Sequence, residues 1–370
     1  MKNTKTEDAI YMKRALKLAR RGAGKVSPNP MVGCVIARGG RIIGEGWHAC
    51  VGEDHAEINA IKNATEPVAG ATFYITLEPC THYGRTPPCV DRLIHERPAR
   101  VVIGVEDPNP VVKGKGIARL RQNGIPVTVG VLAEECRDLN APFFKFMSQG
   151  LPFVTIKYAQ SLDGKIATLT GDARWISSPD ARKFAHALRH LHDAILVGRG
   201  TVSTDNPELT TRLVKGKNPL RIVLDAHLNL PPSMHVFATA REIPTMVAAS
   251  RGASEEKKGA LASLGVEVLP VREVKPGYLD LRELLHLLAE RHITSLLVEG
   301  GSEVITSFLR EGLVDRFIVI VSPCLVGEGK SAVGDLGTRH MEEAKRFTVR
   351  RLLKKGPDRI FILEPRGSET

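Results

Sequence analysis

Three side chains suited to zinc, and one carboxylate beside them, lie in the first quarter of the chain. His55 begins the segment His-Ala-Glu, Cys80 follows a proline, and Cys89 comes after eight further residues. Imidazole and thiolate are ligands that zinc prefers, and three protein ligands leave one tetrahedral position open for water, as catalytic sites require. Glu57 lies two residues after His55, close enough to transfer protons without binding the metal. The pattern predicts zinc-dependent hydrolytic deamination of an aminopyrimidine.

The alternatives are a closed structural zinc site and a chance grouping of unrelated residues. A structural site needs a fourth Cys or His, and His48 and His82 are the nearest candidates. Structural sites generally use shorter spacing between ligands than this chain has. The acid beside His55 therefore favours catalysis.

Two glycine turns in the second half could approach a phosphate. Gly198-Arg-Gly200 follows an expected strand at 194–197, and Gly300-Gly301-Ser302 follows another at 295–298. A turn that opens a helix in this way presents backbone N–H groups to an anion. Neither turn is a full Gly-x-Gly-x-x-Gly fingerprint, and a glycine pair after a strand more often reflects tight packing. Spacing alone leaves the ligand of this half open.

The elements expected to position the zinc ligands alternate between helix and strand. Helical spacing covers 9–19, a hairpin with a Gly-Gly turn covers 32–44, and strands are expected at 71–77, 100–104 and 125–129. His55 and Cys89 would each begin a helix, and Cys80 would follow a strand. The first half is therefore predicted to be a three-layer α/β domain.

A second domain is expected to begin near Gly150, where a helical pattern stops. The domains would span 1–149 and 150–370. Expected strands at 153–157, 194–197, 220–224, 245–248, 266–269 and 295–298 alternate with helical segments. This alternation predicts an α/β domain with a mostly parallel sheet.

Composition narrows the class of protein. The 370 residues carry a formal charge of +11, spread over both halves, whereas a nucleic-acid surface more often concentrates its charge. Phosphorylated metabolites and a phosphorylated dinucleotide would draw on this excess, but charge alone favours an ordinary basic surface. We found no secretory signal, membrane span or disulfide framework, and so predict a cytoplasmic protein. We expect Cys34, Cys136 and Cys324 to be inert buried thiols.

Longer motifs resemble one family. The inter-cysteine loop Cys80–Cys89 and the segment Ser-Pro-Asn-Pro-Met-Val-Gly-Cys at 27–34 are similar to those of the bifunctional deaminase-reductases of riboflavin biosynthesis. The similarity continues through Gly46-Trp-His48, 157–164, 175–177, 201–207 and 298–302, and so covers nearly the whole chain. It implies a cytidine-deaminase-like first domain and a second domain similar to dihydrofolate reductase.

The resemblance also assigns roles around the zinc site. His48 matches a histidine that contacts the pyrimidine, although a surface histidine is the plainer interpretation. Asn29, held between two prolines, would read base or ribose, or be a simple turn residue. His82 and Arg85 lie on the inter-cysteine loop, where Arg85 would hold the substrate phosphate or form a loop salt bridge.

In the second half the family's positions fall into two groups. Those matching the substrate's ribose and phosphate are Lys157, Arg189, Arg212 and Glu299. Those matching the dinucleotide are Ala159, Trp175, Thr201, Asp205, Gly300, Gly301 and Ser302. From sequence alone Trp175 fits a core aromatic nearly as well, and surface charge is the default for each ionic residue. We expect Asp205 to lie in a loop after a strand end.

The resemblance therefore implies two consecutive steps. Zn²⁺-dependent deamination of 2,5-diamino-6-(5-phosphoribosylamino)pyrimidin-4-one would precede reduction of its ribosyl group by NADPH. The partner would be a phosphorylated pyrimidine, with no nucleic acid or membrane, and a homo-oligomer is compatible with the sequence. A tRNA adenosine deaminase would share the zinc ligands but would not need the second domain. A non-catalytic zinc scaffold would not need Glu57.

Overall fold

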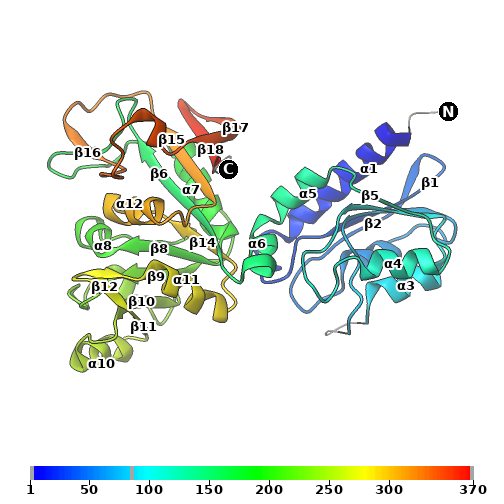
Figure 1. The fold of residues 1–370 in the computed structure, drawn as a ribbon, viewed down its shortest axis with the longest axis horizontal. Coiled ribbons are helices and arrows are strands. Elements are labelled where there is room, and N and C mark those ends of the chain that lie inside the picture. The colour runs from blue at the N-terminus through cyan, green and yellow to red at the C-terminus, as the bar shows by residue number, and fades with distance from the viewer. Residues whose placement is uncertain (1–3, 84–86, 367–370) are drawn as a thin grey trace. The chain divides into compact units, whose positions relative to one another are not determined.

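The computed structural model describes residues 4–83 and 87–366, and the chain divides into two compact units (Figure 1). They comprise Met1–Gly150 and Leu151–Thr370. Each unit has its own hydrophobic clusters, two in the first and two in the second. Within the described residues, no helix has both the length and the apolarity required to span a membrane.

The first unit contains a five-stranded sheet in the order β2-β1-β3-β4-β5. Its strands are β1 (Gly33–Arg38), β2 (Arg41–Trp47), β3 (Thr72–Leu77), β4 (Arg100–Val105) and β5 (Val127–Val129). Strand β1 pairs antiparallel with both β2 and β3, whereas β3, β4 and β5 run parallel. The helices are α1 (Thr4–Ala19), α2 (Ala56–Lys62), α3 (Cys89–Glu96), α4 (Lys115–Gln122), α5 (Ala133–Leu139) and α6 (Ala141–Gln149).

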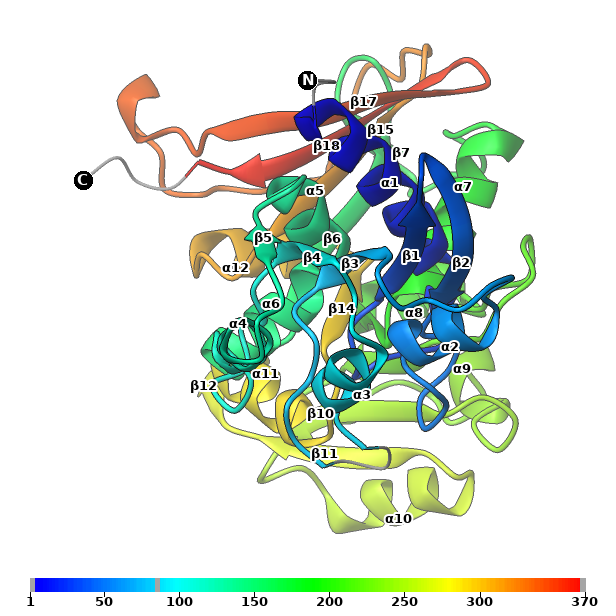
Figure 2. The same ribbon diagram turned by 90° about the vertical axis from the view of Figure 1, so that its right-hand side faces the viewer.

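Alternation along the central strand builds the layers of this unit. Phe73 and Ile75 of β3 pack in one cluster with residues of α2, α3 and α4. Tyr74, which points to the other face, packs with residues of α1, α5 and α6. Figures 1 and 2 show these helices on the two faces of the sheet. The predicted three-layer α/β fold is confirmed.

The second unit is built on a nine-stranded sheet in the order β11-β10-β9-β8-β14-β6-β15-β18-β17. The first seven strands are parallel: β6 (Phe153–Gln160), β8 (Ala194–Gly198), β9 (Leu220–Leu224), β10 (Thr245–Ser250), β11 (Glu267–Val271), β14 (Ser295–Val298) and β15 (Arg316–Val321). The last two, β17 (Phe347–Lys355) and β18 (Asp358–Pro365), form an antiparallel hairpin at one edge. The mostly parallel sheet is confirmed, and the C-terminal hairpin was not predicted.

Helices cover both faces of this second sheet. Residues of α11 (Leu281–Glu290) and α12 (Ser302–Arg310) pack on one face. Residues of α7 (Pro179–Leu191), α8 (Arg199–Asp205), α9 (His235–Ala238) and α10 (Glu255–Ser263) pack on the other. Two short pairs, β7 (Lys165–Thr168) with β16 (Gly329–Ser331) and β12 (Glu273–Lys275) with β13 (Tyr278–Leu279), complete the unit.

Two details of the sequence interpretation are wrong. Cys324 is exposed rather than buried, because it lies in the loop after β15, whereas Cys34 and Cys136 are buried as expected. Asp205 is the last residue of helix α8 rather than a loop residue after a strand.

Candidate active sites

The three expected zinc ligands come from one strand end and two helix starts. Cys80 follows β3 by three residues, His55 is the N-cap of α2, and Cys89 is the first residue of α3. Their ligand atoms all lie within 4.8 Å of one another. His55 Nδ1 is 3.2 Å from Cys89 Sγ and 3.5 Å from Cys80 Sγ. The structure thus brings together residues that are 34 positions apart in the chain.

This donor set fits zinc. One imidazole nitrogen and two sulfurs converge, and no other group of three potential ligands forms within residues 4–83 and 87–366. Hydrogen bonding from Cys89, and then from His55, lowers the pKa of the Cys80 thiol to about 4 despite its burial. A thiolate is the form that binds metal. Neither His48 nor His82 joins the group as a fourth ligand, so the set matches an open catalytic site rather than a closed one.

Glu57 lies in the first turn of α2 and is only 3% exposed. Burial is the largest influence on its carboxyl and raises its pKa above the ordinary value, outweighing the opposing effect of His55. A carboxyl group in such surroundings can hold a proton as well as accept one. The position of Glu57 near the ligands and its raised pKa therefore suit it to proton transfer.

Asn29 and His48 contact each other at the edge of this site. Asn29 Nδ2 lies 3.2 Å from His48 Nε2, and His48 Nδ1 lies 3.2 Å from the carbonyl oxygen of Asp54. A carbonyl only accepts, so Nδ1 carries the proton and Nε2 accepts from the Asn29 amide. Burial lowers the pKa of His48, which favours this neutral form. His48 also stacks edge-on against His55, with ring centroids 5.3 Å apart.

The inter-cysteine loop is described only in part. His82 is exposed, and its charge acts on Asp107. Arg85 lies outside the described residues. Sequence reasoning missed Asp107, whose pKa is raised to about 6, chiefly by burial. The signal was available: Asp107 follows β4 as Cys80 follows β3, and parallel neighbours end at the same edge of a sheet.

Glu78 was also missed, and it fixes the segment that carries Cys80. Its buried carboxylate accepts four backbone N–H bonds, at 2.9–3.2 Å, from Asp107, Gly114, Gly116 and Ile117. Two of these donors belong to the first turn of α4, where a negative charge is favourable. Glu78 thus ties the carboxyl ends of β3 and β4 together below the ligands.

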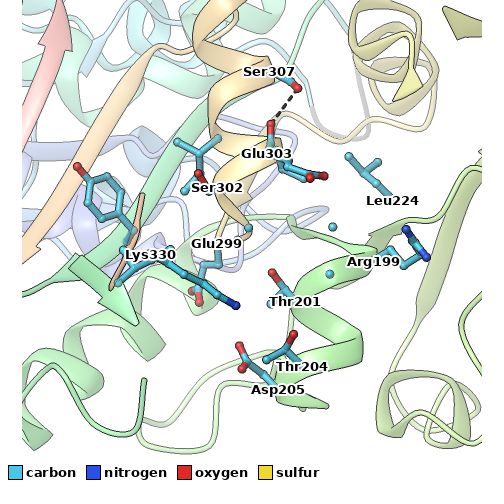
Figure 3. A pocket seen from close by; sticks show the side chains of 18 of the residues that line it. Arg199, Thr201, Thr204, Asp205, Leu224, Glu299, Ser302, Glu303, Ser307 and Lys330 are labelled. Atoms are coloured by element: carbon cyan, nitrogen blue, oxygen red, sulfur yellow. Dashed lines mark hydrogen bonds between the residues drawn. The ribbon is translucent and has the colours of Figure 1, made fainter. Parts of the chain in front are cut away.

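The second unit has a cavity of about 810 Å³ at the carboxyl ends of its parallel strands. Nine of the predicted residues line it: Lys157, Ala159, Trp175, Thr201, Asp205, Glu299, Gly300, Gly301 and Ser302. Figure 3 shows Thr201, Thr204 and Asp205 extending from α8 into this cavity, with Glu299 and Lys330 opposite them. This is the size and position at which α/β sheets bind small molecules and cofactors.

At the two glycine turns the backbone lies so close to neighbouring residues that a side chain would not fit. A Cβ added to Gly300 would lie 2.8 Å from Thr201 Oγ1, and one added to Gly198 would lie 2.7 Å from Val304. Ser302 begins α12, so the turn presents backbone N–H groups at the start of a nine-residue helix. The chain therefore fits a phosphorylated dinucleotide in this cavity. Trp175 is 65% exposed, with the Arg182 guanidinium 4.3 Å from its ring, so it is not a core aromatic.

An ion cluster forms the floor of the cavity. Glu299 accepts two bonds from Arg189, at 2.8 and 3.0 Å, and Lys157 Nζ lies 3.2 Å away. Burial alone would raise the pKa of Glu299, but the two cations outweigh it and lower the pKa to about 2. Lys157 and Glu299 line the cavity, whereas Arg189 does not and is held by Glu299 and the Thr210 carbonyl.

Arg212 lies apart from the cavity wall, in the loop after α8. It pairs with Glu208 at 3.4 Å, and its side chain is nearly half exposed. Its backbone N–H donates to Nδ1 of His186 at 3.1 Å, and that of Leu213 does so at 3.4 Å. His186 was not predicted. Burial, followed by the charges of Arg189 and Arg212, lowers its pKa to about 4, so it remains a neutral acceptor.

Comparison with known sequences decides the family. A sequence model described as "RibD C-terminal domain" matches residues 152–360. A second, "Cytidine and deoxycytidylate deaminase zinc-binding region", matches residues 5–105. A riboflavin biosynthesis protein RibD of Aquifex aeolicus is 46% identical over 96% of this chain and 98% of its own. The chain belongs to the RibD family.

Other RibD proteins are similar to this chain over nearly its whole length. RibD of Escherichia coli K12 is 40% identical, covering 95% of this chain and 98% of its own. A Thermotoga maritima structure described as a diaminohydroxyphosphoribosylaminopyrimidine deaminase and 5-amino-6-(5-phosphoribosylamino)uracil reductase has a TM-score of 0.87, with 37% identity over 98% of this chain and all of that one. RibD of Acinetobacter baumannii has a TM-score of 0.86 with 35% identity over the same shares.

Membership confirms the predicted class of enzyme. As a RibD protein the chain is a bifunctional deaminase and reductase of riboflavin biosynthesis, acting on a small molecule. The deaminase zinc-binding match contains all three ligands and Glu57. The RibD C-terminal match contains every residue of the cavity that the sequence had singled out.

Proposed function

We propose that residues 1–149 remove the exocyclic 2-amino group of 2,5-diamino-6-(5-phosphoribosylamino)pyrimidin-4-one. The products would be 5-amino-6-(5-phosphoribosylamino)uracil and ammonia. The observation that carries the proposal is the convergence of His55, Cys80 and Cys89 within 4.8 Å, beside a buried carboxyl group. The names of the Thermotoga relative's two activities support the choice of substrate.

Different residues of this site would bind the metal, transfer protons and orient the substrate. Zinc, when held by His55, Cys80 and Cys89, supplies Lewis acidity and lowers the pKa of water. Glu57 takes up a proton from the attacking water and returns it to the departing amine, a task suited to its raised pKa. Asn29 and His48 orient the pyrimidine. His82 and Arg85 on the inter-cysteine loop bind toward the phosphate end of the substrate.

Residues 150–370 would then reduce the ribosyl group, in its open-chain form, to ribityl. NADPH, when bound, supplies the hydride. Gly300, Gly301 and Ser302 would hold its phosphates, while Ala159, Trp175, Thr201 and Asp205 position the rest of the dinucleotide. Lys157 and Glu299 would orient the sugar chain on the cavity floor, and Arg189 would hold Glu299 in place. Arg212 does not line the cavity, and its proposed role toward the phosphate rests on the family resemblance.

We also propose a location, a substrate class and an oligomeric state for the enzyme. We place it in the cytoplasm, acting on a free metabolite rather than on nucleic acid or at a membrane. The spread of its basic residues over both units supports a metabolite substrate over a polymer. A homo-oligomer is the proposed form, to be measured by light scattering after size exclusion.

The test supplies the zinc-loaded chain with the diaminopyrimidine substrate and NADPH. We expect one ammonia released and one NADPH oxidised per substrate, with oxidation lagging behind ammonia release. Parallel reactions use a tRNA anticodon-loop oligonucleotide that contains adenosine. Deamination of that RNA, with none of the free pyrimidine, would contradict the proposal.

A further inference from the structure

A buried asparagine near the end of the first unit does not form the capping hydrogen bond that its position before a helix favours. Asn140 lies between α5 and α6 and is the N-cap of α6. Asparagine at an N-cap usually accepts a hydrogen bond from the first turn of its helix. Here the side chain makes no such bond, and Pro142 removes one of the donors that it would serve.

The Asn140 amide instead binds the loop that carries Asn29. Its Oδ1 accepts from the backbone N–H of Met31 at 2.8 Å, and its Nδ2 donates to the carbonyl oxygen of Met31 at 2.9 Å. These two bonds join residues 109 positions apart, and Asn140 is 2% exposed. An amide that satisfies both backbone groups of one residue fixes that residue in position and in rotation.

Met31 lies two residues from Asn29, and the contacts continue from there to the zinc ligands. The Asn29 amide meets His48 Nε2, and the His48 backbone N–H donates to the Val32 carbonyl at 3.0 Å. The His48 ring packs against His55. A shift of Met31 would therefore move both groups to which we assign the orientation of the pyrimidine.

The helices on either side of Asn140 are anchored in the core of the same unit. Cys136 of α5 and Phe143 of α6 pack in one cluster with Val35 and Tyr74 of the sheet. The deaminase zinc-binding match ends at residue 105, so this helix pair lies outside it. The pair is thus more than a connection to the second unit, because its core packing gives Asn140 a rigid base.

We propose that Asn140 is a positioning residue of the deaminase site, acting through the Met31 backbone on Asn29 and His48. The inference rests on the proposed role of Asn29. Loss of the amide leaves two polar groups of Met31 unsatisfied and frees the loop. Because Asn29 would contact the pyrimidine before and during the reaction alike, the effect is expected in KM rather than in kcat.

The experiment compares full-length Asn140→Ala and Asn140→Asp with wild type. Asn140→Asp keeps the acceptor for the Met31 N–H but sets a carboxylate oxygen against the Met31 carbonyl. Both variants should raise the deaminase KM about tenfold or more, with kcat within about threefold. Zinc content and the reductase constants, measured with deaminated substrate, should not change. Asn123→Ala is the matched control, since Asn123 makes an exposed bond to the Arg119 carbonyl in the same unit.

A second arm separates this inference from the role of Asn29. Asn29→Ala should raise the deaminase KM as well, and the double variant with Asn140→Ala should be no worse than the poorer single variant, because both act on one contact. Multiplying effects would overturn the coupling. An unchanged KM in both Asn140 variants, with only a lower melting temperature, would overturn the positioning role. An Asn29→Ala enzyme with normal KM would refute the role of Asn29 itself.

Discussion

At the scale of single residues, the surroundings of Glu57 and Glu299 shift the pKa values of these two carboxyl groups in opposite directions. Among the described residues, the effect of His55 on Glu57 is too small to offset burial, and the pKa of Glu57 is raised. The side chain of Glu299 is 5% exposed, but Arg189 and Lys157 lower its pKa to about 2. The first can exchange protons, while the second remains an anion that is paired with Arg189 and Lys157. Environment rather than residue type separates the two roles.

His186 gives a prediction about pH. Its pKa in the folded protein is about 4, below the value near 6.5 expected in the unfolded chain. The unfolded state therefore gains a proton first as pH falls. The contribution of neutral His186 to stability is complete above about pH 6.5 and is lost progressively between about pH 6.5 and 4.

His186→Asn should flatten this dependence. Asparagine can still accept from the Arg212 N–H but does not titrate, so the melting temperature of the second unit should fall less over this pH range than in wild type. Calorimetry of the full chain measures it, with His286→Asn, an exposed histidine of α11, as control. Identical pH profiles for wild type and His186→Asn would show that His186 does not carry the effect.

The residues of the zinc site could be predicted from sequence because their chemistry is local and their types are rare. His55, Glu57, Cys80 and Cys89 stand out by type and spacing. Glu78 and Asn140 do not, because their partners are backbone groups 29–39 and 109 residues away. A carboxylate or an amide that serves backbone leaves no signature in the chain, and only the fold reveals it.

At the scale of elements, the strands that carry the sites could be predicted from the sequence. The hairpin β17–β18 at one edge of the second sheet could not. Strands β8, β10 and β14 are buried along their whole length, which gives short, mostly apolar runs in the sequence. Strand β17 reads Phe-Thr-Val-Arg-Arg-Leu-Leu-Lys-Lys and is almost wholly exposed. Its pattern has no buried side to detect, and its place is set by pairing with β18.

The Glu299–Ser302 turn yields a prediction about the cofactor. Gly300→Ala would place a Cβ 2.8 Å from Thr201 Oγ1 and 3.2 Å from Val197. Either the turn or α8 must shift, so we expect the NADPH dissociation constant to rise by about tenfold or more, the effect of roughly 1.4 kcal/mol. Fluorescence titration of the full chain measures it.

Gly259→Ala is the control for that substitution. Its Cβ would meet nothing within 4 Å, in helix α10 of the same unit. This variant should bind NADPH as wild type does and should be slightly more stable, because alanine favours helix over glycine. Equal affinities in all three proteins would place the dinucleotide somewhere other than this turn.

At the scale of the whole molecule, each unit has its own core and its own candidate site. The clusters of the first unit end at Phe143 and Met147, and those of the second begin at Leu151. No residue that the structure describes belongs to clusters of both units. Chain length and the break in the helical pattern near Gly150 predict two domains, 1–149 and 150–370, and these domain assignments remain predictions.

Independent cores predict separable folding. A fragment of residues 150–370 should unfold in one cooperative transition and bind NADPH in the presence of a chelator that removes zinc. Calorimetry and fluorescence titration test the two statements. A fragment that is unfolded, or that is folded but does not bind NADPH at millimolar concentration, would mean that the second unit depends on the first.

The most direct test of the account uses intact Glu57→Gln. The amide keeps the size of the side chain but cannot accept the proton. With the diaminopyrimidine substrate the variant should retain zinc and lose at least about a hundredfold in ammonia release. With deaminated substrate it should oxidise NADPH at the wild-type rate. Near-normal ammonia release, or loss of both activities in a folded, zinc-loaded protein, would contradict the assignment of one reaction to each unit.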